Sequence, residues 1–157
     1  MTKLFGILCA CALFSPLAIA ADDDLAVVVN KGNPVENLTK AQLRKIVMGD
    51  QAAWSPGKKV IIVLRAPGQP DRAGVLRTVC GMTEDDFTQH QMQASFNGDA
   101  SNPPKVVATD EAVRTAVATL PGAIGFLRAA DINDSIRAVT VDGMAAGQDG
   151  YKVKSGK

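Results

Sequence analysis

Short apolar runs recur along the chain, and residues typical of turns separate them. The runs occupy residues 25–29, 60–64, 105–109, 123–127 and 136–141. Apolar runs of about four to eight residues that end in turn signals are typical of buried strands. The run at residues 60–64 contains no polar position, which favours a strand covered on both faces. The pattern therefore predicts about five strands.

Between these runs, apolar positions lie three or four residues apart, which is the spacing of one helix face. The first such segment lies between Thr39 and Gly49. Thr39 can cap the helix with Gln42 as its capping-box partner, and Gly49 supplies a C-terminal stop. The sequon formed by residues 37–39 is read more economically as this cap than as a glycan site.

Three further helices are predicted: one that ends at Gly81, one that begins after Thr83, and one that Asp110 caps. Strands that alternate with helices across short turns indicate an α/β fold. The expected architecture is a sheet of about five strands flanked by helices, with much of the sheet parallel.

The N-terminal segment has the pattern of a secretory signal peptide. Lys3 provides a positive charge, residues 4–17 are mostly apolar, and small residues at 18 and 20 suit a signal peptidase. Cleavage is expected before Ala21 or Asp22. The pattern predicts a protein that is periplasmic or secreted.

Residues 1–20 would then be the signal peptide and residues 21–157 a single domain. A weak lipoprotein motif leaves lipidation at Cys11 as an alternative. Removal of residues 1–20 would leave Cys80 as the only cysteine, and His90 is the only histidine in the chain. One cysteine cannot form an internal disulfide, and this pair cannot form a zinc site. We expect no metal and no cofactor.

Charge and hydropathy exclude two classes of partner. Residues 1–20 carry one of the 17 basic residues, Lys3, and none of the 16 acidic ones, so 16 bases face 16 acids in the remainder. Nucleic-acid binding needs clustered Lys and Arg, so it is not expected. No later segment has the ~18 apolar residues of a membrane span, so no stable membrane insertion is expected after cleavage. No nucleophile lies near a base in the sequence, so we expect no enzyme and no catalytic residues.

Four segments, taken in order, resemble a known family. They are LTKAQLRKIVMG at residues 38–49 with Trp54 after it, VIIVLRAPGQPDRAGVLRTVCG at 60–81, PGAIGFL at 121–127 and VTVDG at 139–143. This set is similar to the phosphate-type substrate-binding proteins of ABC transporters, in the type 2 periplasmic-binding-protein superfamily.

The resemblance implies a fold in which two α/β lobes close around a ligand. Members of the family have roughly twice the length of this chain, so the sequence indicates a single lobe. The implied function is binding of phosphate or another small oxyanion or polar ligand, as part of ABC-type transport or sensing. An ABC permease or another envelope protein is the implied partner. The alternative is a protein-interaction scaffold that has lost ligand binding.

The segment RAPGQPDRAG at residues 65–74 joins a predicted strand to a predicted helix, where backbone N–H groups favour anions. In the family this loop carries Ser-Gly-Thr, and the matching residues here are Gln69, Pro70 and Asp71. The Asp71 carboxylate would repel an anion at ~4 Å by about 4 kcal/mol at an effective dielectric near 20. Arg65 and Arg72 could offset that repulsion, or Arg72 could pair with Asp71.

We therefore predict a candidate ligand site made of five residues: Arg65, Gly68, Gln69, Asp71 and Arg72. Arg65 would supply charge and Gly68 would let the backbone approach the ligand. Gln69 and Arg72 would complete the contacts. The competing interpretation is a Pro/Gly turn whose acidic residue caps the following helix.

Overall fold

A computed structural model describes residues 23–55, 57–98 and 102–156. The predicted signal peptide at residues 1–20 and the lipidation alternative at Cys11 lie outside these residues, and both stay predictions. The single domain at 21–157 also stays a prediction. No helix in the described part of the chain is long and apolar enough to cross a membrane.

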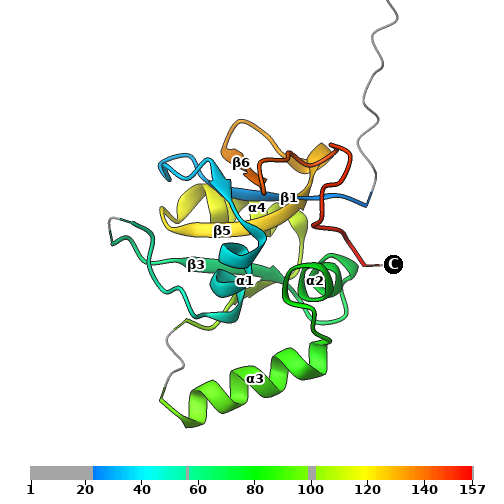
Figure 1. The fold of residues 1–157 in the computed structure, drawn as a ribbon. Coiled ribbons are helices and arrows are strands. Elements are labelled where there is room, and N and C mark those ends of the chain that lie inside the picture. Colours follow the sequence, from blue (N-terminus) through cyan, green and yellow to red (C-terminus); the bar gives the residue numbers. More distant parts are fainter. Residues whose placement is uncertain (1–22, 56, 99–101, 157) are drawn as a thin grey trace, which may run out of the picture.

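The predicted α/β class is confirmed, with a sheet of six strands in the order β2-β6-β1-β5-β3-β4 (Figure 1). The strands are β1 (Leu25–Asn30), β2 (Asn37–Leu38), β3 (Ile61–Arg65), β4 (Lys105–Val107), β5 (Ala123–Arg128) and β6 (Ile136–Val141). The strand beyond the predicted five is β2, which has only two residues and pairs with β6. A strand this short leaves no apolar run in the sequence.

The sheet is mixed. β3 runs parallel to β4 and to β5, and β2 runs parallel to β6. β1 runs antiparallel to both of its neighbours, β5 and β6. The expectation of parallel strands therefore holds for the part that contains β5, β3 and β4. The C-terminal ends of these three strands meet at one edge, and the candidate site lies there.

The helices are α1 (Lys40–Met48), α2 (Pro70–Val75), α3 (Glu84–Phe96) and α4 (Asp110–Thr119). A π-helical turn at Leu76–Cys80 continues α2, and a 3₁₀ turn at Ala129–Asp131 follows β5. α1 and the α2 segment lie on one face of the sheet and α4 on the other (Figure 1). α3 extends away from the sheet, and Phe87 is its one buried residue.

Helix caps follow the sequence signals closely. Thr39 caps α1 and forms the predicted capping box with Gln42, and Gly49 ends the helix in the left-handed region. The predicted cap of α4 was wrong by one residue. Thr109 is the N-cap, because its extended backbone lets Oγ1 accept the Ala112 N–H at 3.1 Å. Asp110 is the first helical residue, and its carboxylate turns toward the candidate site instead.

Three side chains named in the sequence analysis are buried or half-buried in the structure. Cys80 is buried, and desolvation by that burial raises the pKa of its thiol to about 11. Trp54 is buried, and its indole N–H donates to the Gly122 carbonyl at 2.9 Å. His90 is half-buried, with Nε2 at 3.3 Å from the Met48 carbonyl oxygen.

Candidate ligand site

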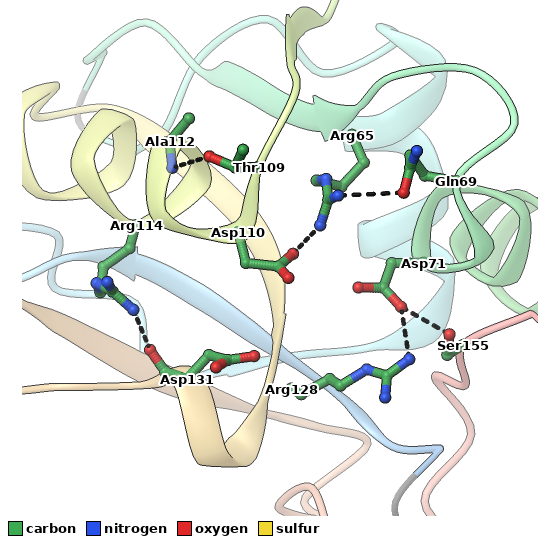
Figure 2. A network of polar contacts seen from close by, with 10 residues as sticks. All are labelled: Arg65, Gln69, Asp71, Thr109, Asp110, Ala112, Arg114, Arg128, Asp131 and Ser155. Carbon is green, nitrogen blue, oxygen red and sulfur yellow. Dashed lines mark hydrogen bonds and ion pairs between the residues drawn. The ribbon is translucent and has the colours of Figure 1, made fainter.

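The predicted ligand loop joins β3 to α2 at the C-terminal edge of the parallel strands. The register aligns Ile62 of β3 with Ile124 of β5, so the two strands end side by side. The N-terminus of α4 reaches the same edge, because β4 ends beside β3. In open α/β sheets ligands bind outside the carboxyl ends of the strands. Figure 2 shows polar side chains from all these elements gathered at this edge.

Arg65 is the last residue of β3, and its side chain is 13% exposed. One terminal nitrogen, Nη1, donates to Asp110 Oδ1, and the other, Nη2, donates to Gln69 Oε1 at 3.1 Å. Its Nε is buried and has no hydrogen-bond partner among the described residues. The side chains of two predicted site residues, Arg65 and Gln69, are therefore in direct contact.

A tight turn sets the path of the loop. The Gln69 N–H donates to the Ala66 carbonyl at 3.2 Å, and Gly68 has a φ of 86°. Pro67 followed by glycine at positive φ is the pattern of a type II turn. Nothing lies within 4 Å of the position that a Gly68 Cβ would take. The turn requires the glycine, and the space beside its backbone is open.

Asp71 has a different partner from either one that the sequence suggested. Its carboxylate accepts a hydrogen bond from Ser155 Oγ at 2.6 Å and lies 3.5 Å from Arg128 Nη2. The Asp71 side chain is 8% exposed, and that of Arg128 is 48% exposed. α2 has no side-chain cap at its N-cap residue, Gln69, so the interpretation of the acidic residue as an internal cap was wrong.

Arg72 does not pair with Asp71, which corrects the other expectation. Its guanidinium binds the Glu84 carboxylate through Nε at 2.8 Å and Nη2 at 2.6 Å. Its Nη1 donates to the Arg65 carbonyl at 3.2 Å, and the group lies 5.6 Å from the centre of the Phe87 ring. Arg72 is buried and joins the start of α3 to the ligand loop.

Sequence reasoning missed Arg128, Asp110 and Ser155 as members of this cluster. Arg128 ends β5 and Asp110 begins α4, so both occupy the edge where the parallel strands end. The sequence did contain a signal for these two residues. Each is the first charged residue after an apolar run, and parallel strands would bring such residues to the same edge of the sheet. Ser155 left no comparable signal, because it follows the last strand and reaches Asp71 from 84 positions away.

The cluster combines a small cavity with partly exposed charged side chains. The cavity under the loop is about 10 Å³ and is lined by Leu64, Arg65, Asp71 and Phe126, among others. That volume is roughly enough for one water molecule. A ligand at this edge would therefore sit on the surface of the cluster, where Asp110 and Arg128 are partly exposed.

Fold and site together define an α/β lobe with charged side chains gathered at the carboxyl edge of its parallel strands. The chain belongs to the PBP superfamily domain family, whose model matches residues 19–156. The resemblance to phosphate-type substrate-binding proteins is confirmed at the level of family and fold.

Three solved structures show the similarity of fold. An ABC-type phosphate transport receptor from Vibrio cholerae has a TM-score of 0.68 at 22% identity, over 85% of this chain and 54% of its own. A second structure is a putative phosphate ABC transporter substrate-binding protein with bound phosphate, from Clostridium perfringens. It has a TM-score of 0.65 at 24% identity, over 79% of this chain and 47% of its own. PstS from Borrelia burgdorferi has a TM-score of 0.67 at 15% identity, over 85% of this chain and 55% of its own. The chain thus spans about half the length of these structures.

Proposed function

We propose that this chain is an exported, non-enzymatic substrate-binding domain that binds phosphate or a related small oxyanion. It would act in ABC-type transport or sensing, with an ABC permease or another envelope protein as its partner. The observation that carries the proposal is the convergence of Arg65 and Arg128 at the shared end of two parallel strands. Gln69 lies against Arg65 and adds a polar side chain to the same edge.

The relatives support the same class of ligand. The Vibrio cholerae structure is described as a phosphate transport receptor, and the Clostridium perfringens structure as a putative phosphate ABC transporter substrate-binding protein with bound phosphate. The apolar N-terminal segment and the position of these relatives in transport support export to the periplasm. The absence of a nucleophile–base pair in the sequence supports a binding role over catalysis.

The two carboxylates of the cluster favour an oxyanion that carries a proton. Asp71 and Asp110 accept hydrogen bonds and cannot donate them when ionised. Monohydrogen phosphate has an O–H that can donate to such an oxygen, whereas sulfate at neutral pH has none. A sulfate oxygen near either carboxylate would meet only repulsion. Phosphate is therefore the expected ligand, and sulfate is the matched negative control.

Isothermal titration calorimetry tests the proposal with sodium phosphate and sodium sulfate at pH 7. We expect heat with phosphate, no heat with sulfate, and loss of the phosphate signal in Arg65→Ala and in Arg128→Ala. Arg77→Ala is the control, because Arg77 is exposed on the segment that continues α2 and lies outside the cluster. Circular dichroism checks that each variant is folded.

The proposal fails if the folded wild-type protein gives no heat with phosphate. No heat with any anion would favour the alternative function, an interaction scaffold. Unchanged phosphate binding in both Arg65→Ala and Arg128→Ala would place the ligand elsewhere.

A further inference from the structure

Among the described residues, no strand pairs with the outer edge of the sheet at β4. β4 is the last strand in the sheet order and pairs with β3 on one side. The Val107 carbonyl accepts a hydrogen bond from the Ala66 N–H, so the backbone groups of Val107 face β3. Because these groups alternate in direction along a strand, the N–H and C=O of Val106 point away from the sheet.

The side chains on both faces of this edge are also uncovered. Val106 is 52% exposed, whereas Leu64, its register partner on β3, is 2% exposed. On the opposite face a groove of about 600 Å³ lies between β4 and α4. The strand side of the groove is formed by Lys105 and Val107. The helix side consists of small and polar residues with one carboxylate: Thr109, Glu111, Ala112, Thr115, Ala116, Thr119 and Leu120.

We propose that a second copy of this chain pairs along β4, in antiparallel fashion, about a two-fold axis at Val106. The two Val106 residues would then exchange both of their outward hydrogen bonds, as directly opposed residues of an antiparallel pair do. Their side chains would lie together on one face of a sheet that continues through both copies. A two-fold arrangement uses the same patch on each copy and is the commonest symmetry of protein dimers.

Charge complementarity identifies a second copy as the occupant. In this register Lys105 of each copy lies opposite the partner's Val107. Val107 is the last residue of β4, so this lysine lies near the point where the facing chain continues toward α4. Glu111 is exposed in the first turn of α4 and lines the same groove. Each groove would therefore receive the partner's Lys105 beside its own Glu111. The lysine stem would cover the small side chains of α4, as long amphipathic side chains do.

A lysine on an edge strand can instead prevent strand pairing. That interpretation and the dimer predict opposite results for the same substitutions. If Lys105 keeps the edge unpaired, the wild-type protein would be monomeric, and Lys105→Glu or removal of Lys105 would leave association unchanged or increase it. If Lys105 pairs with the partner's Glu111, reversal of either charge would place like charges together in two symmetric contacts.

Sedimentation equilibrium and light scattering on protein recovered after expression of the full chain test the proposal, over concentrations from micromolar to near millimolar. We expect a concentration-dependent dimer, weakened about tenfold or more by Lys105→Glu and by Glu111→Lys. The double variant Lys105→Glu/Glu111→Lys should restore it. Lys31→Glu and Asp134→Lys are matched controls at exposed positions outside the groove, and they should leave the dimer unchanged. A monomer at all concentrations, stronger association in Lys105→Glu, or no rescue in the double variant would each overturn the proposal.

Phosphate calorimetry on Lys105→Glu separates this inference from the proposed ligand function. Lys105 lies outside the Arg65–Arg128 cluster, so phosphate binding should persist in the monomeric variant. Phosphate binding by a wild-type protein that stays monomeric would mean that only the dimer proposal has failed. A wild-type dimer that gives no heat with phosphate would mean that only the ligand proposal has failed.

Discussion

Gly74 provides the sharpest test of how the C-terminal segment is held against α2. A Cβ added to Gly74 would lie 2.1 Å from the Lys154 carbonyl oxygen and 2.5 Å from the Gly156 nitrogen. Both of these atoms belong to the backbone, so no side-chain rotation can relieve the overlap. The substitution Gly74→Ala must therefore displace the last residues of the chain.

The displacement removes two hydrogen bonds that fix this segment. Ser155 Oγ donates to Asp71 at 2.6 Å, and the Gly156 N–H donates to the Pro70 carbonyl at 2.7 Å. Each bond contributes about 1 kcal/mol net, and overpacking adds about 1–3 kcal/mol. Alanine gains about 1 kcal/mol over glycine from helix propensity, which opposes these losses. The net expectation is a loss of about 2–4 kcal/mol, opposite in sign to propensity alone.

Urea unfolding, followed through the fluorescence of the single tryptophan, measures this change. For a slope of about 2 kcal/mol/M, the midpoint should fall by about 1–2 M. Ser155→Ala should cost less in the Gly74→Ala background than in the wild type, because the Ser155 contact is already broken there. Ala73→Gly is the control for propensity in the same helix. A higher midpoint for Gly74→Ala would refute the reasoning.

Three further predictions concern the first helix and the core. Thr39→Ala should cost about 1 kcal/mol, because the Gln42 N–H loses its acceptor at 3.1 Å; an unchanged urea midpoint would contradict this. Trp54→Phe should lower the free energy of unfolding by about 1–3 kcal/mol, because the buried Gly122 carbonyl loses its hydrogen-bond donor. Urea unfolding followed by circular dichroism measures this change, and an unchanged midpoint would mean that another donor replaces the indole N–H. Between pH 9 and 11 the stability should fall by up to about 1.4 kcal/mol per pH unit, since the Cys80 thiol ionises near its ordinary pKa of 9.0 when unfolded and near about 11 when folded. Cys80→Ala should remove that part of the slope in a pH series of urea midpoints.

The sequence predicted the elements whose signals are local. Thr39, Gln42 and Gly49 bracket α1 because a cap acts within a single turn of helix. The same locality explains the error at α4, where Thr109 and Asp110 are adjacent and both suit an N-cap. When two adjacent residues could each cap a helix, the other contacts of their side chains decide which one does. Asp110 has Arg65 as its partner, so Thr109 takes the cap.

The partners of the site's charges could not be predicted, because they come from distant parts of the chain. Asp71 contacts Arg128 and Ser155, which follow it by 57 and 84 positions. Arg72 turns from its neighbour Asp71 to Glu84 at the start of the next helix. The antiparallel direction of β1 also depends on long-range pairing, since an apolar run carries no sign of its direction. The sequence thus predicted that a loop with Arg65 at its start joins a strand to a helix, and it missed how the charges of that loop are neutralised.

The arginines of the cluster differ in the free energy needed to move each one from its present partner to a bound anion. Arg72 makes two short contacts with Glu84 and stacks near Phe87, and its side chain is 7% exposed. Removing a guanidinium from such a site leaves a carboxylate without its partner in a partly buried position, at a cost of several kcal/mol. Arg65, whose side chain is 13% exposed, makes one contact with the Asp110 carboxylate, which is 39% exposed. Arg128 is 48% exposed and 3.5 Å from Asp71. Arg65 and Arg128 have fewer contacts to give up to an anion than Arg72, which stays with Glu84. Arg72→Lys should therefore alter the stability of the loop more than its affinity for phosphate.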